Sequence, residues 1–141
     1  MTKYWLALSD DKNWEIIRDD NIYAVKSENQ YNLLNVGDFL VMYLIPKKIC
    51  ALYEIKSMPS RKKIKFNQNK FKYYFDIKPK LILHEPIEIN NWSSGKNIPD
   101  NLSIFKGTMR WGTVLMGRSI INITKADYDY LEKEMIKNAS I

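Results

Sequence analysis

Side chains that could perform acid-base or nucleophilic chemistry are few in this chain of 141 residues. It contains one histidine, His84, and one cysteine, Cys50, so a Ser-His-Asp or Cys-His mechanism would depend on a single imidazole. His84 follows an apolar alternation typical of a strand, and Cys50 lies in an expected hairpin, where a packed thiol is the usual arrangement. We therefore expect no catalytic residue and no enzymatic activity.

The sequence also lacks the residue patterns of common metal and nucleotide sites. One Cys and one His cannot supply the ligands of a structural zinc site, and neither CxxC nor HExxH spacing occurs. The five glycines form neither a GxGxxG fingerprint nor a phosphate-binding P-loop. We expect no metal and no cofactor.

The four tryptophans are the side chains best suited to bind a flat ligand. A base stacked on an aromatic ring gains roughly 1–3 kcal/mol. Core packing is the alternative use of these rings, and it is favoured for Trp14, which is spaced at a helical interval from Ile17. The tryptophans lie near predicted loop edges, at Trp5, Trp14, Trp92 and Trp111.

Positive charge is concentrated in one segment. Lys56 to Lys80 holds nine lysines and arginines against Asp76 alone, a net charge of +8, whereas the whole chain carries +6. Clustered cations attract polyanions and gain from counterion release. A nucleic-acid partner follows from this pattern, with a solvated lysine-rich loop as the alternative. The side chains expected to contact phosphate in this segment are Lys62, Lys63 and Lys65.

The element expected to organise the fold is the stretch Gly37 to Ile55, which predicts two strands joined at Pro46-Lys47-Lys48. The apolar run Leu40 to Ile45 is too short to span a membrane, and a strand that is apolar on both faces is enclosed on both faces. We interpret this hairpin as the wall of a small closed or nearly closed β-barrel.

Other elements are predicted around the hairpin. Apolar and polar residues alternate from Phe71 to Leu83, which predicts a strand with one solvent-exposed face. Pro79 within it indicates an edge or a bulge. Thr124 opens a C-terminal helix with Asp127 in a capping-box pattern. The remaining predictions are a strand at Lys3 to Leu8, a helix capped at Ser9 to Asp11 and running through Arg18, an extended piece at Asn21 to Lys26, a helical turn at Asn29 to Asn35, a short strand at Pro86 to Ile89, a loop at Asn90 to Asn101 and a last strand at Trp111 to Met116.

Length and composition predict a single domain over residues 1–141. With 45% hydrophobic and 27% charged residues, the chain has the composition of an ordinary globular protein. The N-terminus shows no signal-peptide pattern, and no apolar run is long enough for a bilayer. We expect a cytoplasmic protein without a membrane partner; its oligomeric state is left open.

Four segments occur in a family-specific order along the chain: KYWLALSDDKNWEII, NIYAV, VGDFLVMYL and RWGTVLMGRSIINIT. Together they resemble the EVE domain, a member of the PUA-like superfamily and a relative of the YTH domain. Two departures occur. Many bacterial EVE domains have Gln-Gly-Arg where this chain has Met116-Gly117-Arg118, and Tyr23 occupies a position where relatives often have tryptophan.

The resemblance implies an α+β class with a PUA-like mixed fold, a small curved or closed β-barrel flanked by helices. It also implies a pocket that receives one flipped, modified base. EVE domains resemble readers of cytosine derivatives in DNA, and YTH domains read methylated adenine in RNA. It further implies that Tyr23 stacks on the base, that Ser9 or Asp10 bonds its edge, and that Arg118 contacts a phosphate. The implied base pocket consists of Ser9, Asp10, Tyr23, Ala24, Lys26, Trp111, Gly117 and Ser119.

The residues and the resemblance together predict a non-catalytic module that binds DNA or RNA carrying a modified base. One alternative is a PUA-like module that binds structured RNA without needing a modification. Another is an enzyme acting on a nucleoside-like substrate in the same cleft, because one fold can support unrelated chemistry.

Overall fold

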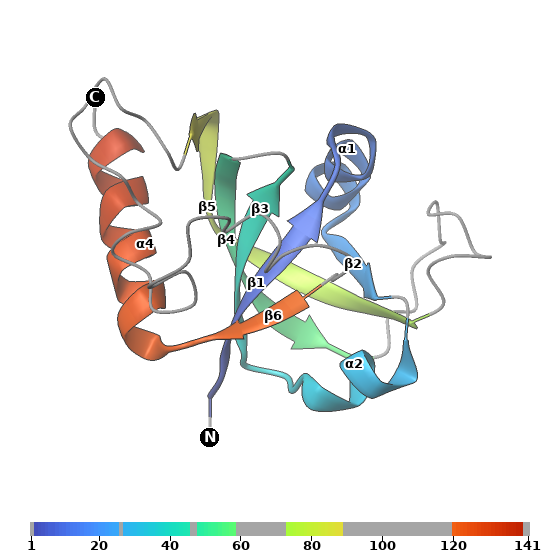
Figure 1. The fold of residues 1–141 in the computed structure, drawn as a ribbon. Coiled ribbons are helices and arrows are strands. Elements are labelled where there is room, and N and C mark those ends of the chain that lie inside the picture. Colours follow the sequence, from blue (N-terminus) through green and yellow to red (C-terminus); the bar gives the residue numbers. More distant parts are fainter. Residues whose placement is uncertain (1, 26, 46–47, 59–72, 89–119, 140–141) are drawn as a thin grey trace.

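The computed structural model describes residues 2–25, 27–45, 48–58, 73–88 and 120–139. Within these ranges six strands form one mixed sheet that curls into a half-barrel, with helices at its flanks (Figure 1). This confirms the predicted α+β class. In chain order the elements are β1 (Tyr4–Ser9), α1 (Asp11–Asp20), β2 (Ile22–Val25), α2 (Glu28–Leu33), β3 (Phe39–Leu44), β4 (Lys48–Ser57), β5 (Tyr73–Glu88), β6 (Ile120–Ile123) and α4 (Lys125–Ala139).

The strands are ordered β2-β5-β4-β3-β1-β6 across the sheet. β1 and β3 are parallel, with Tyr4 opposite Phe39 and Ser9 opposite Leu44, and every other neighbouring pair is antiparallel. The carboxyl ends of β1 and β3 therefore meet at one edge of the half-barrel. α1 starts from that edge, immediately after β1.

The predicted central hairpin is confirmed as β3 and β4. Five of the six residues of β3 are buried. Leu40 and Met42 belong to the core inside the curved sheet, whereas Val41 and Tyr43 belong to a second core on its outer face. Because side chains alternate between the faces of a strand, the uninterrupted apolar run reflects a strand covered on both sides.

α1 has the ends that its sequence favours. The carboxylate of Asp10 caps the helix by accepting a hydrogen bond from the backbone N–H of Asn13 at 2.7 Å. Asn21 closes it with a left-handed conformation (φ 53°), which asparagine tolerates better than most residues. Trp14 and Ile17 face the inner core, as predicted.

A buried carboxylate fixes the start of β3. Asp38 is 1% exposed, and its two oxygens accept hydrogen bonds from three donors at 3.0 Å: the backbone N–H groups of Lys3 and Asn35 and the indole Nε1 of Trp5. Backbone N–H and indole donors satisfy the charge that burial would otherwise penalise. Gly37, at φ +94°, makes the preceding turn possible.

β5 is longer than predicted, because Pro86 and Ile87 continue the strand that contains Pro79 instead of forming a separate one. Pro79 lies opposite Tyr53, next to a register shift between Leu52 and Tyr53. β2 pairs only with the part of β5 before this point, so the missing N–H of Pro79 breaks no described pairing. The register shift and the missing pairing beside Pro79 agree with the predicted edge or bulge.

β6 is a strand to which the sequence analysis assigned no structure. Ile120 to Ile123 pair antiparallel with β1 and form the end of the sheet. The expected strand at Trp111 to Met116 and the loop at Asn90 to Asn101 lie outside the described residues, as does most of the basic segment. No helix within the described ranges is both long and apolar enough to cross a bilayer.

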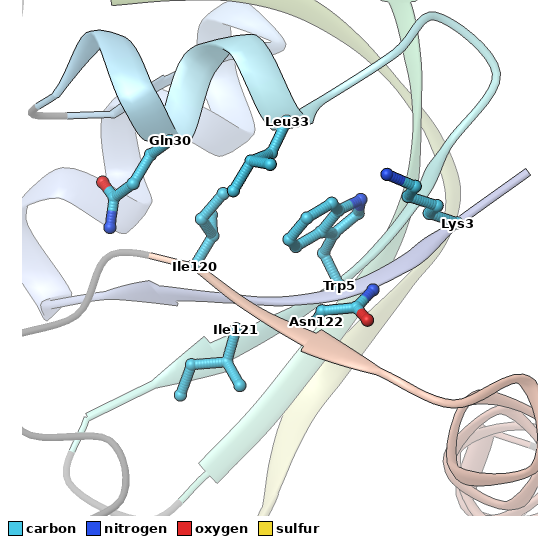
Figure 2. A pocket seen from close by; sticks show the side chains of 7 residues that line it. All are labelled: Lys3, Trp5, Gln30, Leu33, Ile120, Ile121 and Asn122. Carbon is cyan, nitrogen blue, oxygen red and sulfur yellow. The ribbon is translucent and has the colours of Figure 1, made fainter.

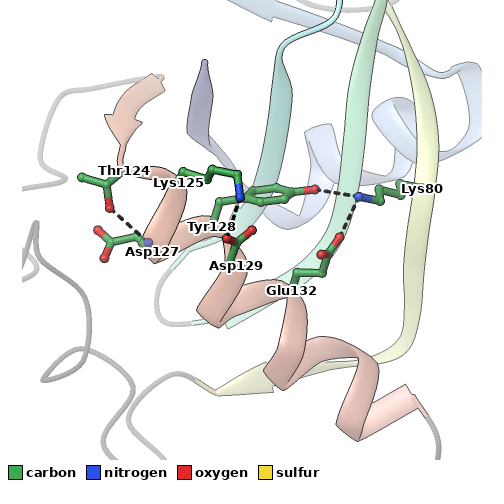
Figure 3. A network of polar contacts seen from close by, with 7 residues as sticks. All are labelled: Lys80, Thr124, Lys125, Asp127, Tyr128, Asp129 and Glu132. Carbon is green, nitrogen blue, oxygen red and sulfur yellow. Dashed lines mark hydrogen bonds and ion pairs between the residues drawn. The ribbon is translucent and has the colours of Figure 1, made fainter. Parts of the chain in front are cut away.

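α4 covers the outer face of the sheet (Figure 1). Its predicted cap is confirmed, since Thr124 Oγ1 accepts a hydrogen bond from the backbone N–H of Asp127 at 3.0 Å. The helix has an apolar stripe at helical spacing, and its residues Tyr128, Leu131 and Met135 are buried. Lys80 of β5 reaches the helix and forms an ion pair with Glu132 at 2.7 Å (Figure 3).

Candidate functional site

The candidate site lies where β1 ends and α1 begins. The backbone carbonyl of Ser9 accepts a hydrogen bond from the N–H of Ile45 at 2.9 Å, which ties this end of β1 to the end of β3. The Ser9 hydroxyl is buried and donates to the carbonyl oxygen of Asp10 at 2.9 Å. Ser9 therefore shapes the turn into α1, and its hydroxyl proton is already engaged.

Among the predicted pocket residues that the structure describes, Asp10 is the exposed one. Its Oδ1 caps α1 through Asn13 at 2.7 Å. An ionised carboxylate has several acceptor sites, so it can cap a helix and also accept a hydrogen bond from an exocyclic amino group of a base. The structure therefore leaves the predicted contact between Asp10 and a base edge geometrically possible.

Tyr23 lies beside the same end of β1 but inside the core. Its hydroxyl donates to the carbonyl oxygen of Leu8 at 2.7 Å, and its ring centroid lies 5.7 Å from that of Phe75. Only 2% of Tyr23 is exposed, and burial raises the pKa of its hydroxyl. The structure thus places the Tyr23 hydroxyl against Leu8, the residue before Ser9, with the ring in the core. The ring would have to become exposed before a base could stack on it.

Of the other predicted pocket residues, Ala24 is described, and it is 3% exposed in the inner core. The rest of the predicted site falls outside the described residues and stays a prediction. These residues are Lys26, Trp111, Gly117 and Ser119 of the base pocket, together with the phosphate contacts Arg118, Lys62, Lys63 and Lys65.

Three lysines of the basic segment lie within the described residues, and their surroundings differ. Lys56 and Lys78 are exposed. Lys80 is engaged with Glu132, and its ammonium lies 4.9 Å from the ring centroid of Phe39. The one acidic residue of the segment, Asp76, accepts a hydrogen bond from the Ser57 hydroxyl at 2.7 Å. Lys80 therefore has a structural role, whereas Lys56 and Lys78 are free to face a polyanion.

The structure also shows features that the sequence analysis missed. A pocket of about 450 Å³ lies between α2 and β6 at the opposite end of β1, with Trp5 at its base (Figure 2). The Tyr53 hydroxyl is fully buried without a hydrogen-bond partner among the described residues. Neither feature has a local sequence signal, since both arise from strands that are distant in sequence. Within the described ranges, no three His, Cys, Asp or Glu side chains cluster as metal ligands.

Comparison with known proteins defines the fold. The Mmi1 YTH domain in complex with RNA is similar at a TM-score of 0.69 and 11% identity, covering 96% of this chain and 79% of that one. The Pho92 YTH domain in complex with m6A is similar at 0.63 and 15% identity, covering 95% and 83%. The predicted relation to YTH domains is therefore confirmed at the level of the fold.

Sequence comparison finds relatives in archaea. The UPF0310 protein PH1033 of Pyrococcus horikoshii is 28% identical over 149 residues, covering 94% of this chain and 99% of that protein. No family model matches the sequence. Membership of the EVE family therefore stays a prediction, whereas the YTH-like α+β fold is a property of the structure.

Proposed function

We propose that this chain is a non-catalytic RNA-binding module that reads a modified base. The observation that carries the proposal is the match, over 95% or more of the chain, to YTH domains solved with RNA and with m6A. A nucleic-acid partner is also supported by the concentration of nine lysines and arginines between Lys56 and Lys80. We assign the binding site to the carboxyl end of β1.

The site supports base recognition through hydrogen bonding at the start of α1. The exposed Asp10 carboxylate can accept from a base edge, and the first turn of a helix favours negative charge from a nearby phosphate. A methyl group buried in a pocket contributes only about 0.8 kcal/mol, so recognition of a methylated base requires other contacts to hold that base. Arg118 is the residue that we assign to the phosphate.

The test is a titration of matched RNA oligonucleotides with and without m6A, followed by RNA and DNA oligonucleotides with and without a methylated cytosine. We expect tighter binding of one modified RNA oligonucleotide than of its unmodified partner. Equal affinity for every pair would overturn modified-base reading, and no binding to any oligonucleotide would overturn the proposal as a whole.

Two variants separate base recognition from strand positioning. Asp10→Asn keeps a good helix cap but replaces a pure acceptor by an amide, so it should change the preference between modified and unmodified RNA with little change in melting temperature. Arg118→Ala should lower the affinity for modified and unmodified oligonucleotides by the same factor, because phosphate contacts position the strand without reading sequence. If Asp10→Asn kept the same preference for modified over unmodified RNA, the Asp10 carboxylate would not be a base contact.

A second candidate is a module that binds structured RNA by shape and phosphate contacts. The burial of Tyr23 favours it, since this side chain offers no open ring face for stacking. Equal binding of modified and unmodified hairpins, together with weak binding of unstructured strands, would support this candidate. Turnover of a free nucleoside in the same samples would instead indicate an enzyme.

A further inference from the structure

Ile45 is an exposed apolar residue at the edge that carries the candidate site. It follows β3 directly, and 46% of it is exposed. Its backbone N–H donates to the carbonyl oxygen of Ser9 at 2.9 Å, which holds its main chain against the end of β1. A single exposed isoleucine is common on protein surfaces, so its neighbours decide what it can do.

Asp10 is the neighbour of Ile45 across the strand ends. Ser9 and Leu44 form the last pair in the parallel ladder of β1 and β3, and Asp10 and Ile45 are the residues that follow them. Asp10 keeps an extended conformation (φ −91°, ψ 173°), and the bond from Ile45 to Ser9 continues the ladder by one step. Adjacent strands lie about 4.8 Å apart, and paired residues project to the same face. We infer that the Asp10 carboxylate and the Ile45 side chain lie side by side.

The Tyr23 ring does not offer an alternative apolar contact in this structure. It is 2% exposed, its centroid lies 5.7 Å from that of Phe75, and its hydroxyl donates to Leu8. Leu44, the residue before Ile45, is 4% exposed and belongs to the inner core. Among the described residues at the carboxyl ends of β1 and β3, Ile45 is the most exposed apolar side chain, so a ligand reaches it without rearrangement.

An acceptor beside an apolar side chain matches a base that has an N–H donor beside a methyl group. Two kinds of modified base present this pair: adenine methylated on its amino nitrogen, and cytosine methylated on the ring carbon next to its amino group. Carboxylates accept from base amino groups, and apolar side chains contact base methyl groups. Burial of one methyl group changes the affinity by a factor of about four.

We propose that Ile45 is the specificity-determining residue of the site, and that the base it selects has an amino N–H directly beside a methyl group. The amino group donates to the Asp10 carboxylate, which orients the base so that its methyl group contacts Ile45. The assignment of Ile45 rests on the proposed function and adds to it the chemical class of the modified base. This contact allows a methyl group to be recognised while Tyr23 stays in the core.

The first experiment measures the coupling between Ile45 and the methyl group. Wild-type protein and Ile45→Ala are titrated by fluorescence anisotropy with RNA oligonucleotide pairs that differ only in adenine against m6A, or in cytosine against 5-methylcytosine. Two proteins and one pair form a double-mutant cycle. In the pair that the wild type discriminates, Ile45→Ala should reduce the preference for the methylated strand by about fourfold. The affinity for the unmodified strand should not change.

Val36→Ala is the matched control. Val36 is 59% exposed and precedes β3, whereas Ile45 follows it, so the six residues of the strand separate them by roughly 20 Å. This variant should leave the affinity for both strands unchanged. Ile45→Val keeps a branched apolar side chain and should retain most of the preference. Melting temperatures should stay close to that of the wild type, because both substituted residues are exposed.

The second experiment tests the arrangement of donor and methyl group in the base. N6,N6-dimethyladenine and N4,N4-dimethylcytosine have methyl groups but no amino N–H, so neither should bind the wild type more tightly than the unmodified base does. 2-Methyladenine keeps the amino group but has its methyl group away from it. It should therefore bind like adenine.

Three results would overturn the assignment of Ile45. One is a pair that the wild type discriminates and in which Ile45→Ala leaves the preference unchanged. Another is a dimethylated base that binds as tightly as the base with one methyl group. In both cases the wild type still prefers a modified strand, so the proposed function stands. The third is equal affinity of the wild type for both members of each pair, which would also overturn modified-base reading.

Discussion

Two tyrosine hydroxyl groups occupy the same inner core but differ in their partners. Tyr23 donates to the carbonyl oxygen of Leu8 at 2.7 Å. Tyr53 is completely buried against the edge of Trp14, and its hydroxyl has no partner among the described residues. A buried polar group without a partner costs free energy, whereas a satisfied one contributes a modest gain.

Removing these hydroxyl groups should therefore have opposite effects. Tyr53→Phe should raise the free energy of unfolding by about 1–3 kcal/mol, because it removes an unsatisfied buried group. Tyr23→Phe should lower it by about 0.5–1.5 kcal/mol, because it leaves the Leu8 carbonyl unpaired. Urea denaturation of the two variants measures both changes. A shift of the same sign in both would contradict the hydrogen bonding described here.

At the scale of elements, α4 is held to the sheet by packing and by one cation. Tyr4, Phe39 and Tyr128 form an aromatic cluster, with centroid distances of 4.8–5.9 Å. The Lys80 ammonium lies over the rings of Phe39 and Tyr128 and pairs with Glu132 (Figure 3). This hydrogen bond to Glu132 raises the pKa of Lys80 above its ordinary value of about 10.5.

The sign of this shift predicts a pH dependence. A raised pKa in the folded state means that the ion pair stabilises α4 fully below the ordinary pKa and is lost as the pH rises through the folded-state value. Lys80→Met should lower the free energy of unfolding by about 1 kcal/mol or less at neutral pH, since the ion pair is partly exposed. The difference from wild type should disappear at strongly alkaline pH. Lys78→Met, on the same strand, should show no such pH-dependent difference.

A substitution in the central strand should destabilise the protein more than a substitution at the cap of the last helix. Met42 is fully buried in β3, so Met42→Ala should cost roughly 2–5 kcal/mol by opening a cavity. Thr124→Ala should cost on the order of 1 kcal/mol, because it removes only the cap of α4. Chemical denaturation compares the two. Equal, small losses would show that β3 is not the central strand of the core.

At the scale of the whole molecule, the basic segment predicts a salt-dependent affinity for RNA. If it neutralises about four phosphates, the logarithm of the binding constant should fall against the logarithm of salt concentration with a slope of roughly −3 to −4. Replacing Lys62, Lys63 and Lys65 by glutamine should make the slope shallower without altering base preference. If the binding constant of the wild-type protein did not change with salt concentration, the basic segment would not contact RNA.

Local patterns in the sequence determined much of the fold. The apolar run of β3, the caps at Asp10 and Thr124 and the stripe on α4 all follow from interactions between residues near one another in the chain. The bulge beside Pro79 follows from the missing N–H of proline. The resemblance carried by four segments further predicted the YTH-like fold, which the structural comparisons confirm.

Only the tertiary structure decided which residues are available to a partner. Ile120 to Ile123 form a strand because they pair with β1, and the Asn122 side chain meets the carbonyl of Tyr4 across 118 positions of sequence. The placement of Tyr23 in the core and the three donors around Asp38 depend on equally distant segments. Burial and pairing of this kind are set by long-range packing, which local propensity and spacing do not encode.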